Sequence, residues 1–506
     1  MKRNVTKNIF LNTLAFSCHT LGWLLRTREA KPEPPTLGDT FRMEQGREIE
    51  LRARNLYPGG LLIEDPNPES AHKKTINVIE NREVPAVFGA TFLVDDFVTK
   101  ADILQRVEGD WRLNEVKSSV VDKPELVDDL AYTAMVAERG GLKISESSLI
   151  LISKDFRLGM SNDRLFDRKD HTDEVQERIG LFKPYWDIVE ETTRAPRKPE
   201  PKLKLQCKKC ELFAQCFGAG IKNHIFEIPR LSQKKYDELA KRGIVSIEDI
   251  PDSFPLTERQ GRVRECVKKN KPIVGTEFKK HLETLSWPVY YLDFETVATA
   301  IPLYPNIAPY DKVPTQYSAH KCSAPGRALE HYEFLADPSR DCRKELIESL
   351  LETLGDTGSI VVYGTFEKTL LSSLADAFPG VSNEIKALID RLVNLEQIVS
   401  ADFCHPDFHG STSMKIVLPA LVPEISYDAL EIKDGDTAMA AFANLALGKY
   451  NMERADEVKK NLKVYCTQDT LALYEVQQRL VQICGSKPEQ QEPHHQASLR
   501  EFSDKS

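Results

Sequence analysis

The feature that most constrains this chain is a short apolar segment that carries two acidic side chains. It runs from Tyr291 to Thr296, and its aromatic and branched residues predict a buried strand. Because residues two apart in a strand point the same way, Asp293 and Glu295 share one face while Phe294 packs on the other. Two such carboxylates in a half-buried strand are unfavourable unless a cation lies between them, and a hard divalent ion is the simplest partner. The alternative, an exposed acidic strand end, fits the apolar neighbours less well.

The composition is that of an ordinary globular protein with several domains. The 506 residues suffice for two to four domains of about 100–200 residues each. Hydrophobic residues make up 41% and charged residues 29% of the chain, and the formal net charge is -9. An acidic chain argues mildly against nucleic acid as a partner, but the charge is unevenly distributed, so local basic surfaces remain possible.

The first 30 residues resemble a signal peptide only superficially. Lys2 and Arg3 precede an apolar stretch from Ile9 to Phe16, but this stretch is short and no small-residue cleavage site follows it. The pattern favours an amphipathic helix running to Leu25. No run approaches the roughly 18 apolar residues of a membrane span, so we expect a cytoplasmic protein that does not enter a membrane. Its ten cysteines are then unsuited to disulfides, and a cluster among them indicates metal binding or catalysis.

A second acidic set lies in the N-terminal third of the chain. The pattern predicts a hairpin with Asp102 on its first strand and with Glu115 and Lys117 on one face of its second, followed by a helix over 126–139. Asp102 and Glu115 could hold Mg²⁺ or Mn²⁺, which acidifies a bound water, while Lys117 could orient that water or stabilise charge on a phosphate. The alternative is a surface hairpin with an incidental Glu–Lys pair, which contributes little.

Three cysteines cluster after a helix predicted over 172–191 and a loop rich in proline and lysine. Cys207, Cys210 and Cys216 lie within ten residues of a polar segment, where core cysteines do not gather. The spacing predicts shared thiolate ligation of zinc or of a 4Fe-4S cluster. Either group needs a fourth ligand, and Cys18, beside His19, is the nearest N-terminal candidate.

This part of the chain resembles the RecB-type PD-(D/E)xK nucleases that carry an iron–sulfur cluster, such as the CRISPR-associated RecB-like exonucleases and the AddB subunit. The resemblance covers roughly residues 5–225 and rests on Cys18 followed by Trp23-Leu24, on the three later cysteines and on the Asp…Glu-x-Lys set between them. It implies a 4Fe-4S cluster, rather than zinc, held by four residues: Cys18, Cys207, Cys210 and Cys216.

Two positions depart from the pattern of that family. After Gly46, Glu50 stands where the family often has histidine, although a carboxylate can still ligate a metal. In the helix after Glu-x-Lys, Tyr132-Thr133 stands where the family has glutamine. Both departures concern catalysis more than fold.

Residues 229–280 are predicted to form a connector of short helices around tight turns. Lysines at 268, 269, 271, 279 and 280 make it the basic part of the chain. Such helices could contact a phosphate backbone through their amides, and a solvated linker face is the alternative.

The C-terminal half offers two further acidic positions. A buried strand over 359–363 runs into a helix whose first turn carries Glu367, a possible third ligand or simply a favourable charge at a helix start. On a helix predicted over 455–480, Tyr465 and Asp469 lie one turn apart on one face. Taken alone, this last pair would read as an ordinary exposed pair.

Together these residues resemble the DEDD exonucleases of the RNase H-like (DnaQ) superfamily, in their tyrosine variant. The order Asp293-x-Glu295, Glu367 and Tyr465-x-x-x-Asp469 carries the resemblance, with Glu367 where most such enzymes have aspartate. It implies that the four carboxylates hold two Mg²⁺ ions for phosphodiester hydrolysis and that Tyr465 positions the attacking water.

Nearly the whole chain resembles a bacterial family of two-nuclease proteins, which joins a RecB-like module to an RNase H-like domain of formerly unknown function. The segments 301–304, 316–318, 366–368, 410–415 and 418–420 carry this resemblance beside the acidic motifs. Glu367 is usual in that family. Lys415 is implied as a phosphate contact of the substrate, and His405 and His409 as structural residues.

We therefore expect an α/β protein in four parts. These are a RecB-like core of the restriction-endonuclease type (1–228), a helical connector (229–280), an RNase H-like mixed-sheet domain (281–485) and a disordered tail (486–506). The expected activity is that of a metal-dependent 3′–5′ exonuclease on single-stranded DNA, with RNA as a further substrate. The alternative is a nucleic-acid-binding protein in which one or both nuclease sites are inactive.

Overall fold

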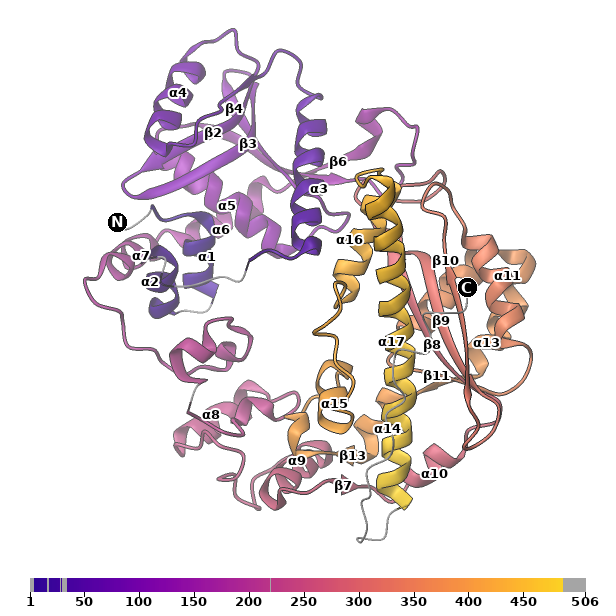
Figure 1. Cartoon of the computed structure of the whole chain (residues 1–506). Coiled ribbons are helices and arrows are strands. Elements are labelled where there is room, and N and C mark those ends of the chain that lie inside the picture. Colours follow the sequence, from indigo (N-terminus) through magenta and orange to yellow (C-terminus); the bar gives the residue numbers. More distant parts are fainter. Residues whose placement is uncertain (1–3, 16–17, 28, 30–33, 219, 486–506) are drawn as a thin grey trace.

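Two mixed β-sheets with helices packed on them make up an α/β protein, as expected (Figure 1). The structure is a computed structural model that describes residues 4–15, 18–27, 29, 34–218 and 220–485. The tail predicted over 486–506 lies outside these residues. Within the described ranges, no helix has the length and apolar character needed to cross a membrane. The domain boundaries at 228 and 280 stay predictions.

The first sheet has six strands in sequence order. They are β1 (Leu61–Leu62), β2 (Ala86–Val94), β3 (Phe97–Val107), β4 (Asp110–Val116), β5 (Ile144–Ile152) and β6 (Phe166–Asp170). The pairs β1/β2 and β4/β5 are parallel and the others antiparallel. The predicted hairpin is β3/β4, and it places Asp102 and Glu115 on neighbouring strands.

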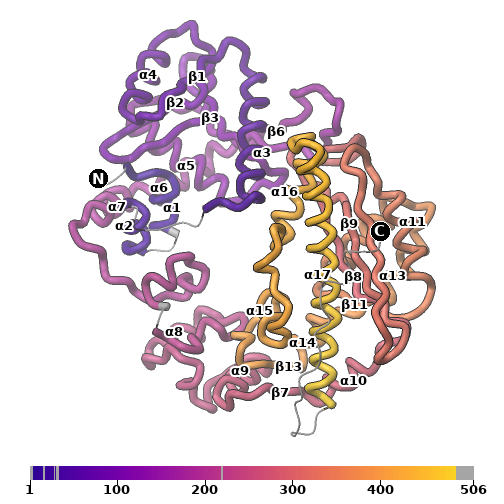
Figure 2. Tube along the Cα trace, in the orientation of Figure 1, coloured from indigo at the N-terminus to yellow at the C-terminus, as the bar shows by residue number. Residues whose placement is uncertain are grey.

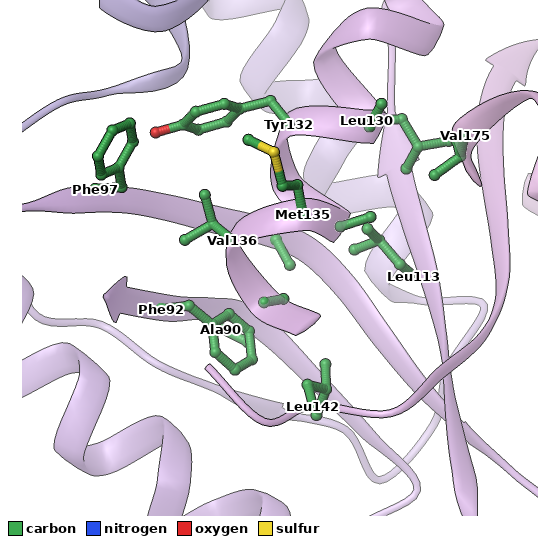
Figure 3. Packing of buried hydrophobic residues seen from close by; sticks show 14 of the residues in the cluster. Ala90, Phe92, Phe97, Leu113, Leu130, Tyr132, Met135, Val136, Leu142 and Val175 are labelled. Carbon is green, nitrogen blue, oxygen red and sulfur yellow. The ribbon is translucent and has the colours of Figure 1, made fainter. Parts of the chain in front are cut away.

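One face of this sheet is covered by α5 (Pro124–Arg139), which the pattern predicted from residue 126. Its apolar side packs into a core with strand residues such as Phe92 and Leu113 (Figure 3). Tyr132 is fully buried there, and its hydroxyl donates to the carbonyls of Val5 and Val98 at 2.9 and 3.2 Å. The other face carries α3 (Leu37–Arg54), and α4 (Pro68–Glu80) packs on β2.

Two helices predicted as continuous are each broken in two. The predicted helix to Leu25 consists of α1 (Lys7–Ala15) and α2 (His19–Thr27), packed so closely that a Cβ at Gly22 would lie 2.2 Å from the Thr13 hydroxyl. The predicted helix over 172–191 consists of α6 (Thr172–Phe182) and α7 (Tyr185–Arg194), because Pro184 cannot donate a helical hydrogen bond. The break lets the Trp186 ring of α7 stack on Phe97 at 3.6 Å between centroids.

The connector forms short helices, as predicted, and pairs with the C-terminal half through a strand that the pattern did not predict. Its helices are α8 (Gln233–Lys241), α9 (Glu258–Lys269) and α10 (Phe278–Glu283). Between the last two, β7 (Ile273–Val274) pairs antiparallel with β13 (Phe403–Cys404). The connector is therefore attached to the C-terminal half by backbone hydrogen bonds.

The second sheet has five strands in the order β10-β9-β8-β11-β12. Their bounds are β8 (Val289–Val297), β9 (Val313–Cys322), β10 (Leu329–Leu335), β11 (Ser359–Val362) and β12 (Leu392–Asn394). The central strand β8 alternates its side chains between two cores. Tyr290, Leu292 and Phe294 face the helices α11 (Arg343–Leu354), α12 (Phe366–Ala377) and α13 (Ser382–Asp390). Val289 and Tyr291 face the opposite core.

That opposite core contains three more helices, the longest of which packs against β8, β9 and β10. They are α14 (Leu395–Asp402), α15 (Met414–Leu421) and α17 (Met452–Gly485). Because Asp293 and Glu295 continue the alternation of Val289 and Tyr291, β8 presents both carboxylates toward α17.

The two halves of the molecule also touch directly, away from the connector (Figure 2). Helix α3 packs against α16 (Gly435–Ala446), where Lys449 and Glu44 form an ion pair. The loop after β8 inserts Ala300 into a small core with Ile49 and Ile152 of the N-terminal half. The backbone amide of Ala300 donates to Oε1 of Gln45 at 2.6 Å.

Candidate active site

Three carboxylates converge at the end of β8. Asp293, Glu295 and Asp469 each offer an oxygen, and these oxygens all lie within 4.8 Å of one another. All three side chains are half-buried. The predicted placement of Asp293 and Glu295 on one face of a strand is thus what the structure has, and Asp469 joins them from α17.

The register of α17 against the sheet fixes the position of Asp469. Gln316 of β9 donates from Nε2 to the Leu462 carbonyl at 3.1 Å, and the Ser318 hydroxyl lies 2.8 Å from that of Thr470. These bonds lie on either side of Asp469, on the helix face turned to the sheet. The predicted neighbour Tyr465, one turn earlier, is buried beside the same carboxylates.

Glu367 lies in the first turn of α12, as the pattern predicted. Its side chain is only 3% exposed, and its Oε2 has no hydrogen-bond partner among the described residues. Burial raises the pKa of Glu367 to about 7. The carboxylate also lies close enough to Asp293 to raise the pKa of that residue.

The electrostatics of the group are those of like charges held together. Burial and then the charge of Glu367 raise the pKa of Asp293 to about 8. Burial, followed by the charges of Asp293, Asp469 and Asp434, raises the pKa of Glu295 well above its usual value. Burial and Asp293 raise the pKa of Asp469 in the same direction, although hydrogen bonds from Tyr427 and Tyr465 oppose that rise.

A divalent cation fits this donor set. No lysine or arginine in the described part of the chain forms an ion pair with any of the four carboxylates. Hard divalent ions prefer carboxylate oxygens, and the buried Oε2 atom of Glu367 accepts no hydrogen bond from any residue that the structure describes. The residues that could hold such an ion are Asp293, Glu295, Glu367 and Asp469.

Sequence reasoning missed three neighbours of this group. The Tyr427 hydroxyl donates to Oδ1 of Asp469 at 2.6 Å, and the Cys466 thiol donates to Oδ2 of Asp293 at 3.8 Å. Asp434, the residue that caps α16, adds its charge beside Glu295. Cys466 lies inside the Tyr465-x-x-x-Asp469 motif and could have been found. Tyr427 and Asp434 lie in a loop with no signal of its own.

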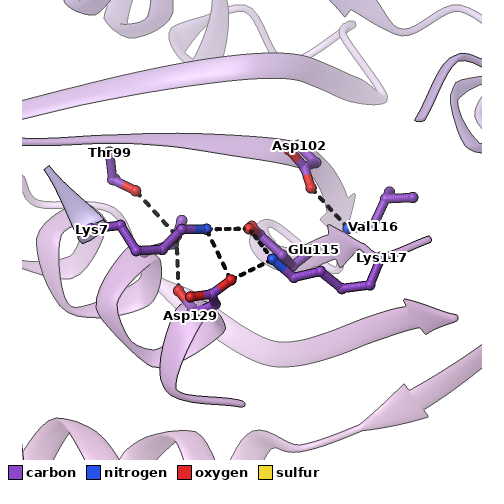
Figure 4. A network of polar contacts seen from close by, with 8 residues as sticks. Lys7, Thr99, Asp102, Glu115, Val116, Lys117 and Asp129 are labelled. Carbon is purple, nitrogen blue, oxygen red and sulfur yellow. Dashed lines mark hydrogen bonds and ion pairs between the residues drawn. The ribbon is translucent and has the colours of Figure 1, made fainter. Parts of the chain in front are cut away.

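The structure also brings together the N-terminal set, Asp102, Glu115 and Lys117, but here lysines compensate the charge of the carboxylates (Figure 4). Lys117 lies 3.2 Å from Glu115 and 2.6 Å from Asp129 of α5, and Lys7 of α1 lies 2.6 Å from Glu115. Lys7 and Asp129 were not anticipated. Burial alone lowers the pKa of Lys117, but the carboxylates of Glu115 and Asp129 raise it above its usual value.

Asp102 completes this set from β3. Its Oδ2 accepts the backbone N–H of Val116 at 2.8 Å, and burial and then Glu115 raise its pKa to about 8. The buried Oε2 of Glu115 has no partner among the described residues, so a cation bound by Asp102 and Glu115 fits the donor set. The lysines already neutralise Glu115, however, so the need for a cation is weaker here than at Asp293.

The positions that depart from the RecB-type pattern lie around this set in different ways. Glu50 pairs with Arg54 on α3, and its charge contributes to the raised pKa of Asp102 after burial and Glu115. Tyr132 bonds backbone carbonyls in the core, and Thr133 accepts from the Thr99 hydroxyl at 3.1 Å. The residue that α5 turns toward Lys117 is Asp129.

The four predicted cysteine ligands line one cavity of about 20 Å³, with Leu21 and Phe213 among its apolar walls. Burial, and then the nearby thiols of Cys18 and Cys210, raise the pKa of Cys216. The cavity thus gathers four thiols from two distant segments of the chain, the donor type that zinc and iron–sulfur clusters share. His19 points elsewhere, with Nδ1 2.6 Å from the Thr192 hydroxyl.

Lys415 is exposed in the first turn of α15, with no ion pair among the residues described. The loop before it is anchored at the end of β11, because the Tyr363 hydroxyl donates to the Thr412 carbonyl at 2.6 Å. His409 lies 3.1 Å from Glu227, and His405 accepts from the backbone of Asp407. These histidine contacts are those of structural residues.

Comparison with known proteins gives sequence relatives without an assigned activity. The family described as "Domain of unknown function (DUF2779)" matches residues 290–413, a segment that contains Asp293, Glu295 and Glu367. The chain is 27% identical over 222 residues to "Uncharacterized protein MG366" of Mycoplasma genitalium, and 24% identical over 223 residues to its homolog in Mycoplasma pneumoniae. Each match covers 40% of this chain and 33% or 34% of the relative, so the chain spans about a third of the length of the curated relatives it matches.

Proposed function

We propose that this protein is a metal-dependent nuclease that removes nucleotides from the 3′ end of single-stranded DNA. One observation carries the proposal: Asp293, Glu295 and Asp469 bring oxygens within 4.8 Å of one another. Glu367 adds a fourth carboxylate, which is buried, and no described lysine or arginine pairs with the group. Such an arrangement is stable at neutral pH when cations occupy it.

The resemblance to the tyrosine variant of the DEDD exonucleases supports the reaction and its polarity. Residues 281–485 are on this proposal an RNase H-like domain. Bound Mg²⁺ or Mn²⁺ would supply a more acidic water and charge stabilisation at the phosphate. The chain's own residues would divide the remaining work between binding and orientation.

The roles of these residues follow from their contacts. The four carboxylates would hold the cations, and Tyr427 and Cys466 would orient Asp469 and Asp293 through their hydrogen bonds. Tyr465 has a strongly raised pKa, first through burial and then through the charge of Asp469, so its phenol keeps its proton. It would act as a hydrogen-bonding group that positions the attacking water and would not serve as a base.

Residues 1–228 are on this proposal a RecB-like module with a 4Fe-4S cluster, and a second candidate function applies to them. Lys7 and Lys117 both form ion pairs with Glu115 and Asp129. Together with Asp102, the set therefore has three carboxylates and two lysines. This balance favours a platform that grips a DNA strand without cutting it, as an alternative to a second nuclease centre. Asp102, Glu115 and Lys117 would cut the strand in the first case and hold it in the second.

Degradation of labelled single-stranded DNA with Mg²⁺ or Mn²⁺ tests both proposals. We expect the wild type to shorten a 5′-labelled strand progressively and Asp293→Ala to lose this activity. The Lys117→Ala variant then shows whether the N-terminal module cuts the strand or only binds it. If Lys117→Ala leaves cleavage chemistry intact and weakens binding, the module is a platform. A wild type that leaves the strand intact with every metal would refute the nuclease proposal.

The cluster is tested by colour and by metal content. We expect anaerobically purified protein to absorb at about 400 nm, where thiolate-bound iron–sulfur clusters show charge transfer, and Cys207→Ser to lose this band. Cys484→Ser, at the end of α17, is the matched control and keeps it. A colourless wild type with one bound zinc would contradict the iron–sulfur assignment.

A further inference from the structure

A groove lies between the connector and the C-terminal half, and neither the four carboxylates nor the N-terminal set uses it. It has a volume of about 500 Å³ and opens to solvent. Arg230 and Arg259 of the connector form one wall, and Thr365, Ser411 and Ser413 of the C-terminal half contribute to the other. Helix α9, which carries Arg259, lies beside β13 and α14 in the chain trace (Figure 2).

The groove is lined for an anion. Arg230 is exposed and Arg259 half-buried, and neither forms an ion pair with a described residue. The acid in the groove, Glu396, has one oxygen engaged by the Thr412 hydroxyl at 3.1 Å. The hydroxyls of the opposite wall are neutral donors that suit phosphate oxygens.

The two walls are held at a fixed distance. A Cβ at Gly410 would lie 1.7 Å from the Glu227 carbonyl, so the two segments touch backbone to backbone there. Gln260 of α9 donates from Nε2 to the Pro229 carbonyl at 2.8 Å, which ties the segment before Arg230 to the helix that carries Arg259. The backbone positions of both arginines are thus fixed by packing and by hydrogen bonds.

The groove adjoins the candidate active site. Thr365 precedes α12, whose first turn carries Glu367. The Asn394 side chain, also in the groove, accepts the Gly364 backbone N–H at 3.0 Å. The wall of the groove is therefore continuous with the segment that leads from β11 into the acidic group.

We propose that this groove binds the phosphate backbone of single-stranded DNA next to the nucleotide being hydrolysed, with Arg230 and Arg259 as the phosphate contacts. This inference rests on the proposed nuclease function. The volume of about 500 Å³ lies in the ~300–1,000 Å³ range of sites for small ligands, which is the scale of one or two nucleotides and not of a duplex. The connector is then part of the substrate site.

Two substrates of different length distinguish strand binding in the groove from hydrolysis at the acidic site. Thymidine 5′-monophosphate p-nitrophenyl ester is short enough to fill the acidic site alone, whereas oligothymidylate also reaches the groove. In the full chain, we expect Arg230→Ala/Arg259→Ala to lower kcat/KM on oligothymidylate at least tenfold, mainly through KM. Hydrolysis of the ester should stay within about twofold of the wild type.

Binding is measured separately in the inactive Asp293→Asn background. We expect the double variant to bind fluorescent oligothymidylate more weakly and with a salt slope smaller by about 1.4, since each lost phosphate contact on a single strand removes ~0.7. Arg230→Lys/Arg259→Lys should restore most of the affinity, because the charges return. Arg327→Ala/Lys344→Ala, which removes two exposed charges elsewhere on the C-terminal half, is the control and should match the wild type.

The outcomes distinguish this inference from the proposed function. If the double alanine variant binds and cuts oligothymidylate as the control does, the groove does not hold the strand and the inference is wrong while the nuclease proposal stands. Equal losses on the ester and the oligonucleotide would also overturn it, because the arginines would then act on the acidic site or on folding. A wild type that binds oligothymidylate through these arginines but cuts neither substrate would refute the nuclease function alone.

Discussion

The hydroxyl of Tyr310 donates a 2.7 Å hydrogen bond to the carbonyl of Ser118, the residue that follows Lys117. Tyr310 lies in the loop after β8, the strand that carries Asp293 and Glu295. This contact therefore joins the segment that contains Lys117 to the loop that follows Asp293 and Glu295 in the chain. Around it, Val120 and Phe156 of one half pack with Ala300 of the other.

We predict that Tyr310→Phe loosens this junction. The loss of the hydrogen bonds to Ser118 should lower the free energy of unfolding by about 1 kcal/mol. Urea denaturation, with hydrogen exchange of the 298–312 loop, measures the effect. Tyr332→Phe is the control, because the Tyr332 hydroxyl bonds one described residue, Glu330 beside it on β10. Equal stability of the two variants would show that the Tyr310 hydroxyl adds no net stability to the junction.

We predict that the metal-free protein loses stability as the pH rises. In the folded chain burial raises the pKa of Asp293 to about 8 and that of Glu367 to about 7, whereas unfolded carboxyls titrate at about 4. Between these values the folded state binds more protons, so its stability is fully present below about pH 4 and is lost as the pH rises through about 7 and 8.

The substitution Asp293→Asn removes part of this dependence. Above about pH 8 in EDTA it should stabilise the protein by about 1–2 kcal/mol relative to the wild type, as measured by urea denaturation. Asp376→Asn, on the exposed face of α12, is the control and should leave the pH profile unchanged. Saturating Mg²⁺ should restore wild-type stability at high pH and should stabilise Asp293→Asn less. A wild-type stability that rises with pH in EDTA would contradict the clustered, uncompensated carboxylates.

The hydrogen bond from Tyr427 to Asp469 should set the metal requirement of the nuclease. Without it the pKa of Asp469 rises further and the carboxylate binds cations less well. We expect Tyr427→Phe to need about tenfold more Mg²⁺ for half-maximal cleavage, with kcat largely recovered at saturation. Tyr465→Phe, by contrast, should lower kcat at every Mg²⁺ concentration. Identical Mg²⁺ curves for wild type and Tyr427→Phe would show that this bond does not orient a ligand.

Lys7 should contribute to the stability of the N-terminal half through Glu115. The Glu115 side chain is 3% exposed and that of Lys7 29%, so their 2.6 Å pair is shielded from solvent. We expect Lys7→Ala to cost about 1–3 kcal/mol of unfolding free energy, and much less when Glu115→Gln is already present. Lys344→Ala, from the exposed pair with Glu348, should cost under about 0.5 kcal/mol. Equal effects of the two lysines would mean that Lys7 is an ordinary surface charge.

Local patterns predicted the elements that carry the acidic residues better than they predicted their neighbours. The period-2 pattern around Asp293 and the helical spacing of Tyr465 and Asp469 are properties of single elements, so both could be read from the sequence. Lys7, Asp129 and Tyr427 reach the two sets from other elements. Local periodicity cannot say which helix faces which strand, so these contacts could not be predicted.

The breaks in the helices were missed for a different reason. Apolar residues continue with helical spacing across Pro184 and across the segment between α1 and α2, so the periodic signal outweighed the local one. Pro184 is a visible breaker that should have ended the helix. The close packing of Gly22 on Thr13, in contrast, is a tertiary contact that only the folded chain reveals. The β7/β13 pairing is equally non-local, since each strand has only two residues.

Single-turnover cleavage of 5′-labelled single-stranded DNA across a Mg²⁺ titration tests the central claim most directly. The claim is that Asp293, Glu295, Glu367 and Asp469 form one cation-dependent hydrolytic centre. We predict that the wild type shortens the strand with a saturable dependence on Mg²⁺, and that Asp293→Asn folds, binds the strand and loses at least a thousandfold in rate at saturation, an effect of roughly 4 kcal/mol. Cleavage by Asp293→Asn at the wild-type rate, or cleavage by the wild type that persists in EDTA, would contradict it.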